Sequence, residues 1–135
     1  MSFPAVIVHG LADASEALAP GLPVTLLSAE GAALFAGCLW WRALVETARR
    51  EHPATPIEDI LDCADSPGRA MAALRIGQRT LVLSPRVAGF EAVATAAAAQ
   101  GSRVLSMAPP ALDLAKPGAA RRLRAWLAGP PAPPG

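Results

Sequence analysis

The segment ILDCADSPGRAMAALRIG, residues 60–77, contains the clearest change from one kind of secondary structure to another in this chain. It opens with apolar residues that are typical of the end of a buried strand. Ser66 and Pro67 follow, and a capping hydroxyl before a proline is typical of the first turn of a helix. Gly77 stands where such a helix would stop. The segment therefore predicts a strand, a short acidic loop and a helix over residues 67–75.

The same pattern recurs along most of the chain. Apolar runs that indicate strands lie at residues 4–8, 23–27, 57–61, 80–83 and 103–106. Segments with helical spacing follow them, at residues 12–19, 30–51, 67–75, 85–100 and 119–127. The strand runs are almost continuously apolar, as in parallel strands covered on both faces, and their alternation with helices indicates βαβ units. We therefore expect an α/β domain over residues 1–128, a three-layer αβα sandwich with a five-stranded parallel sheet, flavodoxin-like or Rossmann-like.

Composition and charge exclude several classes of partner. The chain of 135 residues is 53% hydrophobic and 17% charged, and its net charge of +1 gives no electrostatic reason to bind nucleic acid or an anionic membrane. The longest apolar stretch, residues 32–41, is too short to span a bilayer. The N-terminus does not resemble a signal peptide, and Cys38 and Cys63 form no disulfide framework. We expect a cytoplasmic bacterial protein with a disordered, proline-rich tail at residues 129–135.

The predicted long helix at residues 30–51 is apolar on almost all sides of its first three turns. Packing on a sheet covers only one side of a helix, so the other side is buried by the chain itself or marks an interface. We favour the interface, because tryptophan is enriched at interface hot spots and two-fold homodimers are common. The predicted homodimer contacts are Phe35, Trp40 and Trp41.

Polar residues follow the predicted strands, where ligands bind in open parallel sheets. Helix N-termini at this edge present free N–H groups, which favour a small anion. The sequence indicates no particular cofactor and no metal site. The predicted ligand-binding residues are Ser28, Gly31, Asp65, Ser66, Ser84 and Arg86.

Two residues at the same edge are candidates for catalysis. His9 is suited to proton transfer near neutral pH, and Asp62 could act as a base or bind Mg²⁺. Each has a structural alternative, because a histidine is often satisfied within the fold and an aspartate at a strand end is often paired. Cys63 is best explained as a packing residue. No GxGxxG, Walker or GxSxG motif is present, and the cysteines and histidines are too scattered for a zinc site.

From its third strand onward, the chain resembles the second half of a response-regulator receiver domain. Asp62 ends the third strand and Ser84 the fourth, and this resemblance implies phosphorylation of the aspartate with the help of Mg²⁺. Receivers carry an acidic pair after the first strand and a lysine after the fifth. Here His9 follows the first strand, and Met107 or Ala108 stands at the lysine position. The resemblance is therefore to a degenerate receiver.

Residues 73–101, ALRIGQRTLVLSPRVAGFEAVATAAAAQG, also resemble one βα repeat of the aldolase-type barrels. In those proteins the phrase A-L-x-x-G precedes a hydrophobic strand and the dipeptide S-P. This chain has no strand lysine for a Schiff base, so the resemblance implies a packing unit rather than an activity. In its overall arrangement, the chain is similar to small bacterial flavodoxin-like and Rossmann-like proteins.

Three functional hypotheses follow from the sequence. The favoured one is a small oligomeric binding or interaction module that holds an anionic ligand at the carboxyl edge of the sheet. It predicts that His9 and Asp62 lie apart or are paired within the fold. The second is an enzyme on a small carboxylate or phosphate, which requires these two residues to be close. The third is a receiver-like signalling domain, which requires Asp62 and Ser84 at neighbouring strand ends beneath a shallow pocket.

Overall fold

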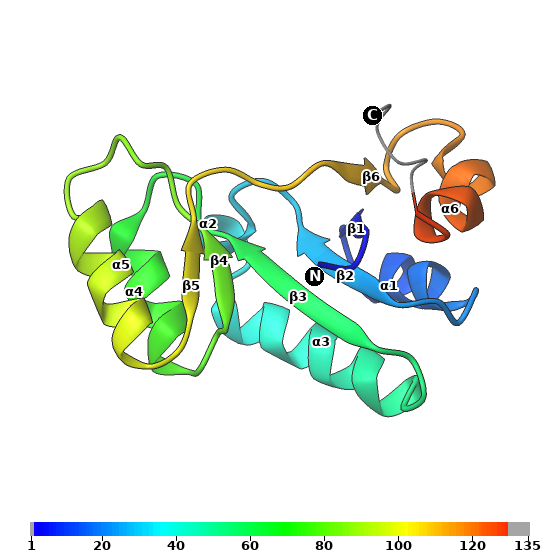
Figure 1. Cartoon of the computed structure of the whole chain (residues 1–135), viewed down its shortest axis with the longest axis horizontal. Coiled ribbons are helices and arrows are strands. Elements are labelled where there is room, and N and C mark those ends of the chain that lie inside the picture. Colours follow the sequence, from blue (N-terminus) through cyan, green and yellow to red (C-terminus); the bar gives the residue numbers. More distant parts are fainter. Residues whose placement is uncertain (1, 130–135) are drawn as a thin grey trace, which may run out of the picture.

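The computed structural model describes residues 2–129 as parallel strands that alternate with helices (Figure 1). Most of the predicted tail, residues 130–135, lies outside the described residues. The α/β class is confirmed. In chain order, the elements are β1 (Ala5–Val8), α1 (Leu11–Leu18), β2 (Val24–Ser28), α2 (Ala32–Phe35), α3 (Cys38–Glu51), β3 (Ile57–Asp62), α4 (Pro67–Arg75), β4 (Thr80–Val82), α5 (Phe90–Ala99), β5 (Arg103–Leu105), β6 (Ala111–Asp113) and α6 (Ala119–Leu127).

The sheet has six parallel strands in the order β5-β4-β3-β2-β1-β6, so the prediction of five strands was wrong. The strand that the sequence did not reveal, β6, lies beside β1, with Ala111 opposite Ala5. It contains three residues and directly follows Pro109 and Pro110. A run of this length is too short to display a periodic pattern, and prolines usually indicate a loop.

The helices of the described chain pack on one face of the sheet. Side chains from all of them join one core cluster with alternate strand residues such as Val6, Leu26 and Leu81. The intervening strand residues, including Leu27 and Val82, form a second cluster that contains no helical residue. The reason lies in the strand order. Steps from β1 to β5 all run in one direction, and right-handed crossovers then place α1 to α5 on the same side, where α6 also packs after β6.

The predicted third layer is therefore not present among the described residues. The chain reverses direction only between β5 and β6, through residues 106–110, which contain no helix. Figure 1 shows this connection as an extended segment that passes from β5 across to β6. One face of the sheet is thus left without helices. Within the described residues, no helix has the length and apolar character needed to cross a membrane.

Two predicted helices have different bounds in the structure. The helix expected at residues 30–51 is divided into α2 and α3 at Gly37, which has φ 89° and ψ 161° and cannot continue a helix. The helix expected from residue 85 begins at Phe90, after Gly89 with φ 97°. The Ser84–Pro85 pair therefore opens a loop. The corresponding prediction at Ser66 is confirmed, because its side chain accepts the N–H of Arg69 at the start of α4.

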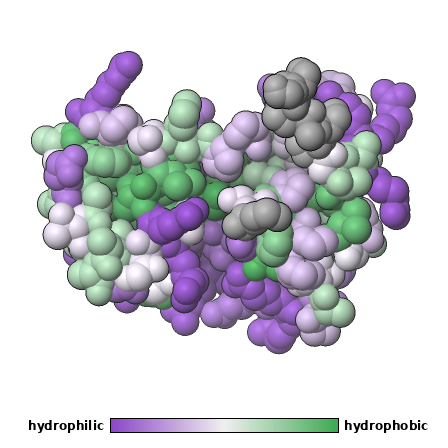
Figure 2. Space-filling view, viewed as in Figure 1, coloured by the Kyte–Doolittle hydropathy of each residue, from purple (hydrophilic) through white to green (hydrophobic). Residues whose placement is uncertain are grey.

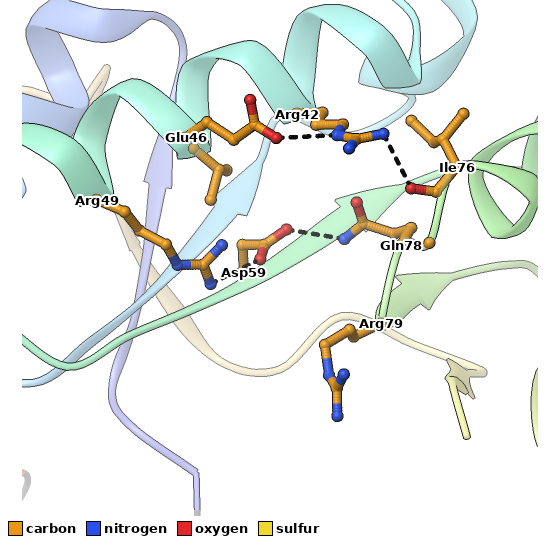
Figure 3. Close-up of a pocket in the computed structure, with 9 residues that line it drawn as sticks. Arg42, Glu46, Arg49, Asp59, Ile76, Gln78 and Arg79 are labelled. Atoms are coloured by element: carbon orange, nitrogen blue, oxygen red, sulfur yellow. Dashed lines mark hydrogen bonds and ion pairs between the residues drawn. The ribbon is translucent and has the colours of Figure 1, made fainter. Parts of the chain in front are cut away.

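Trp41 is a core residue, so its predicted role at a dimer interface was wrong. Its side chain is fully buried, and its Nε1 donates to Asp59 Oδ2 at 3.0 Å. The same oxygen accepts Gln78 Nε2 at 2.8 Å, and Arg49 Nη2 donates to Asp59 Oδ1 at 3.2 Å. Figure 3 shows Arg49 and Gln78 pointing toward Asp59 from α3 and from the residues that precede β4. One carboxylate of β3 therefore connects α3 with the start of β4.

We expect Asp59→Ala to lower the free energy of unfolding by about 1–3 kcal/mol, because it leaves the buried Trp41 indole N–H without its acceptor and removes one of the two acceptors of the Gln78 amide. Urea unfolding followed by fluorescence measures this change. The matched control is Glu58→Ala, one residue earlier on the exposed side of β3, with an expected change within about 0.5 kcal/mol. Equal stability of the two variants would contradict a structural role for Asp59.

Candidate functional site

A cavity of about 640 Å³ lies at the carboxyl ends of the strands, on the side of the sheet that carries no helices. This volume is within the usual range for small-molecule sites. Figure 2 shows hydrophobic side chains gathered over β4, β5 and the end of β3, with hydrophilic side chains beside them. The apolar part of the lining comes from Ile7, Leu27, Ala64, Val82, Pro85, Met107 and Ala108. The polar part comes from Ser28, Glu30, Asp62, Asp65, Ser84 and Ser106.

The apolar wall follows from the pleat of the sheet. Successive side chains of a strand point to opposite faces, and the pairing places Ile7 opposite Leu27 and Leu27 opposite Ile60. On the next strand, Val82 lies opposite Asp62. A row of apolar side chains therefore ends at a carboxylate. The sequence did not lead us to predict this apolar wall, although apolar residues at alternate positions of each strand could have indicated it.

Asp62 is the central polar residue of the cavity. It is 6% exposed, and its Oδ1 accepts the backbone N–H of Ala64 at 2.8 Å and that of Gly31 at 3.1 Å. Its own N–H donates to Ser28 Oγ at 2.9 Å. Its Oδ2 accepts no hydrogen bond from the described residues. Since these residues include no fully buried side-chain oxygen without a partner, Oδ2 is accessible from the cavity.

The charge of the cavity is negative. Glu30, Asp62 and Asp65 line it, and its lining includes no lysine, arginine or histidine. Within residues 2–129, no three acidic, histidine or cysteine side chains are close enough together to hold a metal ion. The lining is therefore acidic and apolar, without a compact metal-binding group.

The structure brings together four of the residues predicted to form the site. Ser28, Asp62, Asp65 and Ser84 line the cavity. The other predicted ligand-binding residues act through the backbone or lie outside the lining. Gly31 donates its N–H to Asp62, Ser66 caps α4, and the N–H of Arg86 is 3.4 Å from Ser84 Oγ.

His9 lies apart from Asp62, because β2 separates β1 from β3. With roughly 4.8 Å between neighbouring strands, the two strand ends are about 10 Å apart. His9 Nε2 is 2.7 Å from Asp113 Oδ1 at the end of β6, and its backbone N–H donates to Asp13 Oδ2 at 2.8 Å. The sequence analysis did not identify Asp113 as a partner, because it did not predict β6. The two candidate catalytic residues thus belong to separate groups.

The geometry matches one feature of a receiver and lacks another. Asp62 and Ser84 are at the ends of neighbouring strands and line the same cavity. In flavodoxin-like folds, however, β1 lies next to β3. Here β2 occupies that position, so the end of β1 is not adjacent to Asp62.

The thiol beside Asp62 is chemically inert. Burial, and to a smaller extent the charge of Asp62, raises the pKa of Cys63 to about 12. A thiol with this pKa carries almost no thiolate at neutral pH, and the thiolate is the nucleophile. Cys63 is fully buried in the core, which agrees with its predicted role in packing.

A second cavity, of about 190 Å³, lies between α3 and the residues that precede β4 (Figure 3). Its polar groups largely satisfy one another. Arg42 Nε donates to Glu46 at 3.0 Å and Arg42 Nη1 to the carbonyl of Ile76 at 3.2 Å, while Arg49 is bound to Asp59. In Figure 3 the guanidinium of Arg79 points away from Asp59. This arrangement stabilises the junction between elements, and the larger cavity is the better candidate site.

We expect the His9–Asp113 pair to stabilise the fold only above acidic pH. Partial burial raises the pKa of Asp113, but the hydrogen bonds from His9 and the Ala115 N–H outweigh it, so the pKa lies below its ordinary value of 3.8. Its contribution is therefore fully present above about pH 4, the ordinary range of an aspartate, and is lost as the pH falls through the lowered pKa.

Asp113→Asn should lower the free energy of unfolding at pH 6 by at most about 1 kcal/mol, since the pair is partly exposed. The difference from wild type should vanish toward pH 2 in urea unfolding. Asp65→Asn, at an exposed aspartate without such a bond, is the control. Parallel pH profiles for wild type and Asp113→Asn would show that the pair does not contribute.

No protein family and no curated protein matches this chain. What the sequence and the structure establish together is an α/β protein with a six-stranded parallel sheet. Any functional conclusion therefore depends on the chemistry of the cavity.

Proposed function

We propose that this chain is a ligand-binding module whose site is the cavity at the carboxyl ends of the strands. The observation that carries the proposal is a cavity of about 640 Å³ with apolar walls and a few polar groups at one edge. Small-molecule sites are typically concave and mostly apolar, with a few placed polar groups. The cavity shares with the ligand sites of open α/β sheets its position at the carboxyl ends of the strands, but it does not include β6, beside which the strand order reverses.

Binding is better supported than catalysis. An enzyme that used His9 as acid and Asp62 as base would need both groups at one substrate. The intervening strand and the His9–Asp113 contact argue against such a pair. A receiver-like role also has less support, because β2 occupies the place beside Asp62 where the acidic pair of a receiver would lie. The module hypothesis requires neither arrangement.

The anionic ligand predicted from the sequence has limited support. Two of the backbone N–H groups at this edge, those of Gly31 and Ala64, already bind the Asp62 carboxylate. The N–H of Arg69 is capped by Ser66. The hydroxyls of Ser84 and Ser106 remain as donors for an anion. The apolar wall makes up more of the cavity than these two hydroxyls do. We therefore assign to the cavity a ligand with an apolar body.

The first test is chemical-shift mapping with 1-hexanol, a neutral probe with an apolar chain. We expect the largest ¹H–¹⁵N shifts at the amides of Leu27, Val82 and Met107, which belong to cavity-lining residues. Ala108→Trp places a large side chain at the lining and should weaken binding at least tenfold. The matched control is Ala54→Trp, which adds the same side chain to an exposed position between α3 and β3, outside the cavity lining.

Shifts scattered over the whole surface, or equal affinities of the two tryptophan variants, would contradict a site in this cavity.

We also propose self-association as a homodimer, now through Phe35 rather than Trp41. Phe35 at the end of α2 is 72% exposed, and Leu39, four residues later at the start of α3, is 68% exposed. Trp40 is partly buried against the core. Large exposed apolar side chains that lie close in sequence commonly mark an interaction surface.

Sedimentation equilibrium of wild type and of Phe35→Ser/Leu39→Ser measures this association. We expect a dimer for the wild type and a dissociation constant at least tenfold higher for the variant. The control, Ala43→Ser/Glu46→Gln, changes exposed positions of α3 and should leave the dimer intact. A monomeric wild type at high protein concentration would contradict the proposal.

We propose the cytoplasm as the compartment of this protein. Cys38 and Cys63 are both free thiols, and disulfides are rare in the reducing cytoplasm.

A further inference from the structure

The electrostatics of the cavity define the class of its ligand more closely. Its walls are apolar, and its charged residues, Glu30, Asp62 and Asp65, are all acidic. An anion at this position would meet like charges and a cation would meet opposite ones. Since the acidic side chains do not form a group that could hold a metal ion, an organic cation fits the lining better than a bare divalent ion.

The burial and hydrogen bonding of Asp62 identify the acidic residue that a ligand would meet. Asp62 is only 6% exposed, yet one of its carboxylate oxygens has no partner among the described residues. Oδ1 is held by the N–H groups of Gly31 and Ala64, which fix the carboxylate in place. Oδ2 is left at the cavity, next to the apolar row that includes Val82 and Leu27. A buried charge is costly unless it is paired, so the geometry favours a partner that brings a positive charge and N–H donors.

We propose that the cavity binds an organic cation, namely an ammonium group attached to an apolar chain, with the ammonium at Asp62 Oδ2. This inference rests on the proposed binding function. The chain of the ligand lies along Ile7, Leu27 and Val82, and its charged end meets the carboxylate. Glu30 and Asp65 strengthen the negative potential at the same edge without needing direct contact.

The test compares three probes of equal chain length by ¹H–¹⁵N titration: n-hexylammonium, 1-hexanol and hexanoate. We expect n-hexylammonium to bind about tenfold or more tightly than 1-hexanol, and hexanoate to bind more weakly than either. Asp62→Asn retains a side-chain oxygen for the Gly31 and Ala64 N–H groups but removes the charge. It should bring the affinity for n-hexylammonium close to that of 1-hexanol, because the charge that distinguishes the two probes is removed.

Asp65→Asn is the matched control for Asp62→Asn. It removes a charge from the same lining at an exposed position, so the preference for the ammonium should fall only slightly. Should Asp62→Asn fail to fold, the wild type supplies a second readout. Nuclear Overhauser contacts from the α-methylene protons of n-hexylammonium should then reach the amides of Gly31 and Ala64, and their absence would overturn the assignment.

The outcomes separate this inference from the function on which it rests. Binding of 1-hexanol in the cavity without a preference for n-hexylammonium would contradict the proposed cationic ligand. It would still support the proposed binding function. Tighter binding of hexanoate would overturn the cationic ligand in favour of the anion predicted from the sequence. If no probe bound in the cavity, the proposed function would fail together with the inference.

Discussion

The helices of the described chain share one face of the sheet because the first five strands are added in one direction. A right-handed crossover places its helix on a side that depends on the direction of the step, so uniform steps give one helical layer. The opposite face then has to bury its apolar side chains without helices. Leu27, Ile60 and Val82 are nonetheless buried, within a cluster formed by the strands themselves. The cavity lies where this cluster reaches the carboxyl ends of the strands.

Asp62 connects this architecture to the proposed chemistry. Alternation along β3 directs it to the same face as Ile60, and its position at the end of the strand places it at the cavity. It also holds the neighbouring loop. Ala64 has φ 49°, which is uncommon for a residue with a side chain, and its N–H donates to Asp62 while its carbonyl accepts the N–H of Ser84 at 2.7 Å. The hydrogen bonds that fix the carboxylate thus also offset the strain of the loop.

Asp59 shows how the same residue type acquires a different role three positions earlier. It lies on the helical side of β3, where Trp41, Gln78 and Arg49 all donate to it. Its hydrogen-bonding capacity is used within the fold, whereas Asp62 retains one oxygen free of such contacts. The two aspartates of one strand therefore divide between a structural role and a candidate binding role. The difference arises because they lie on opposite faces of the sheet, with helices on one side and a cavity on the other.

Much of the local structure could be predicted from the sequence, since strands, helix starts and glycine stops depend on neighbours along the chain. The bounds of α4 and the cap at Ser66 are examples, as is the carboxyl-edge position of Asp62 and Ser84. The tertiary structure alone determined the strand order, the presence of β6 beside β1 and the single helical layer. The tertiary structure also placed Trp41 in the core and brought Asp113 within hydrogen-bonding distance of His9. These features depend on contacts between residues far apart in the sequence, which no local pattern records.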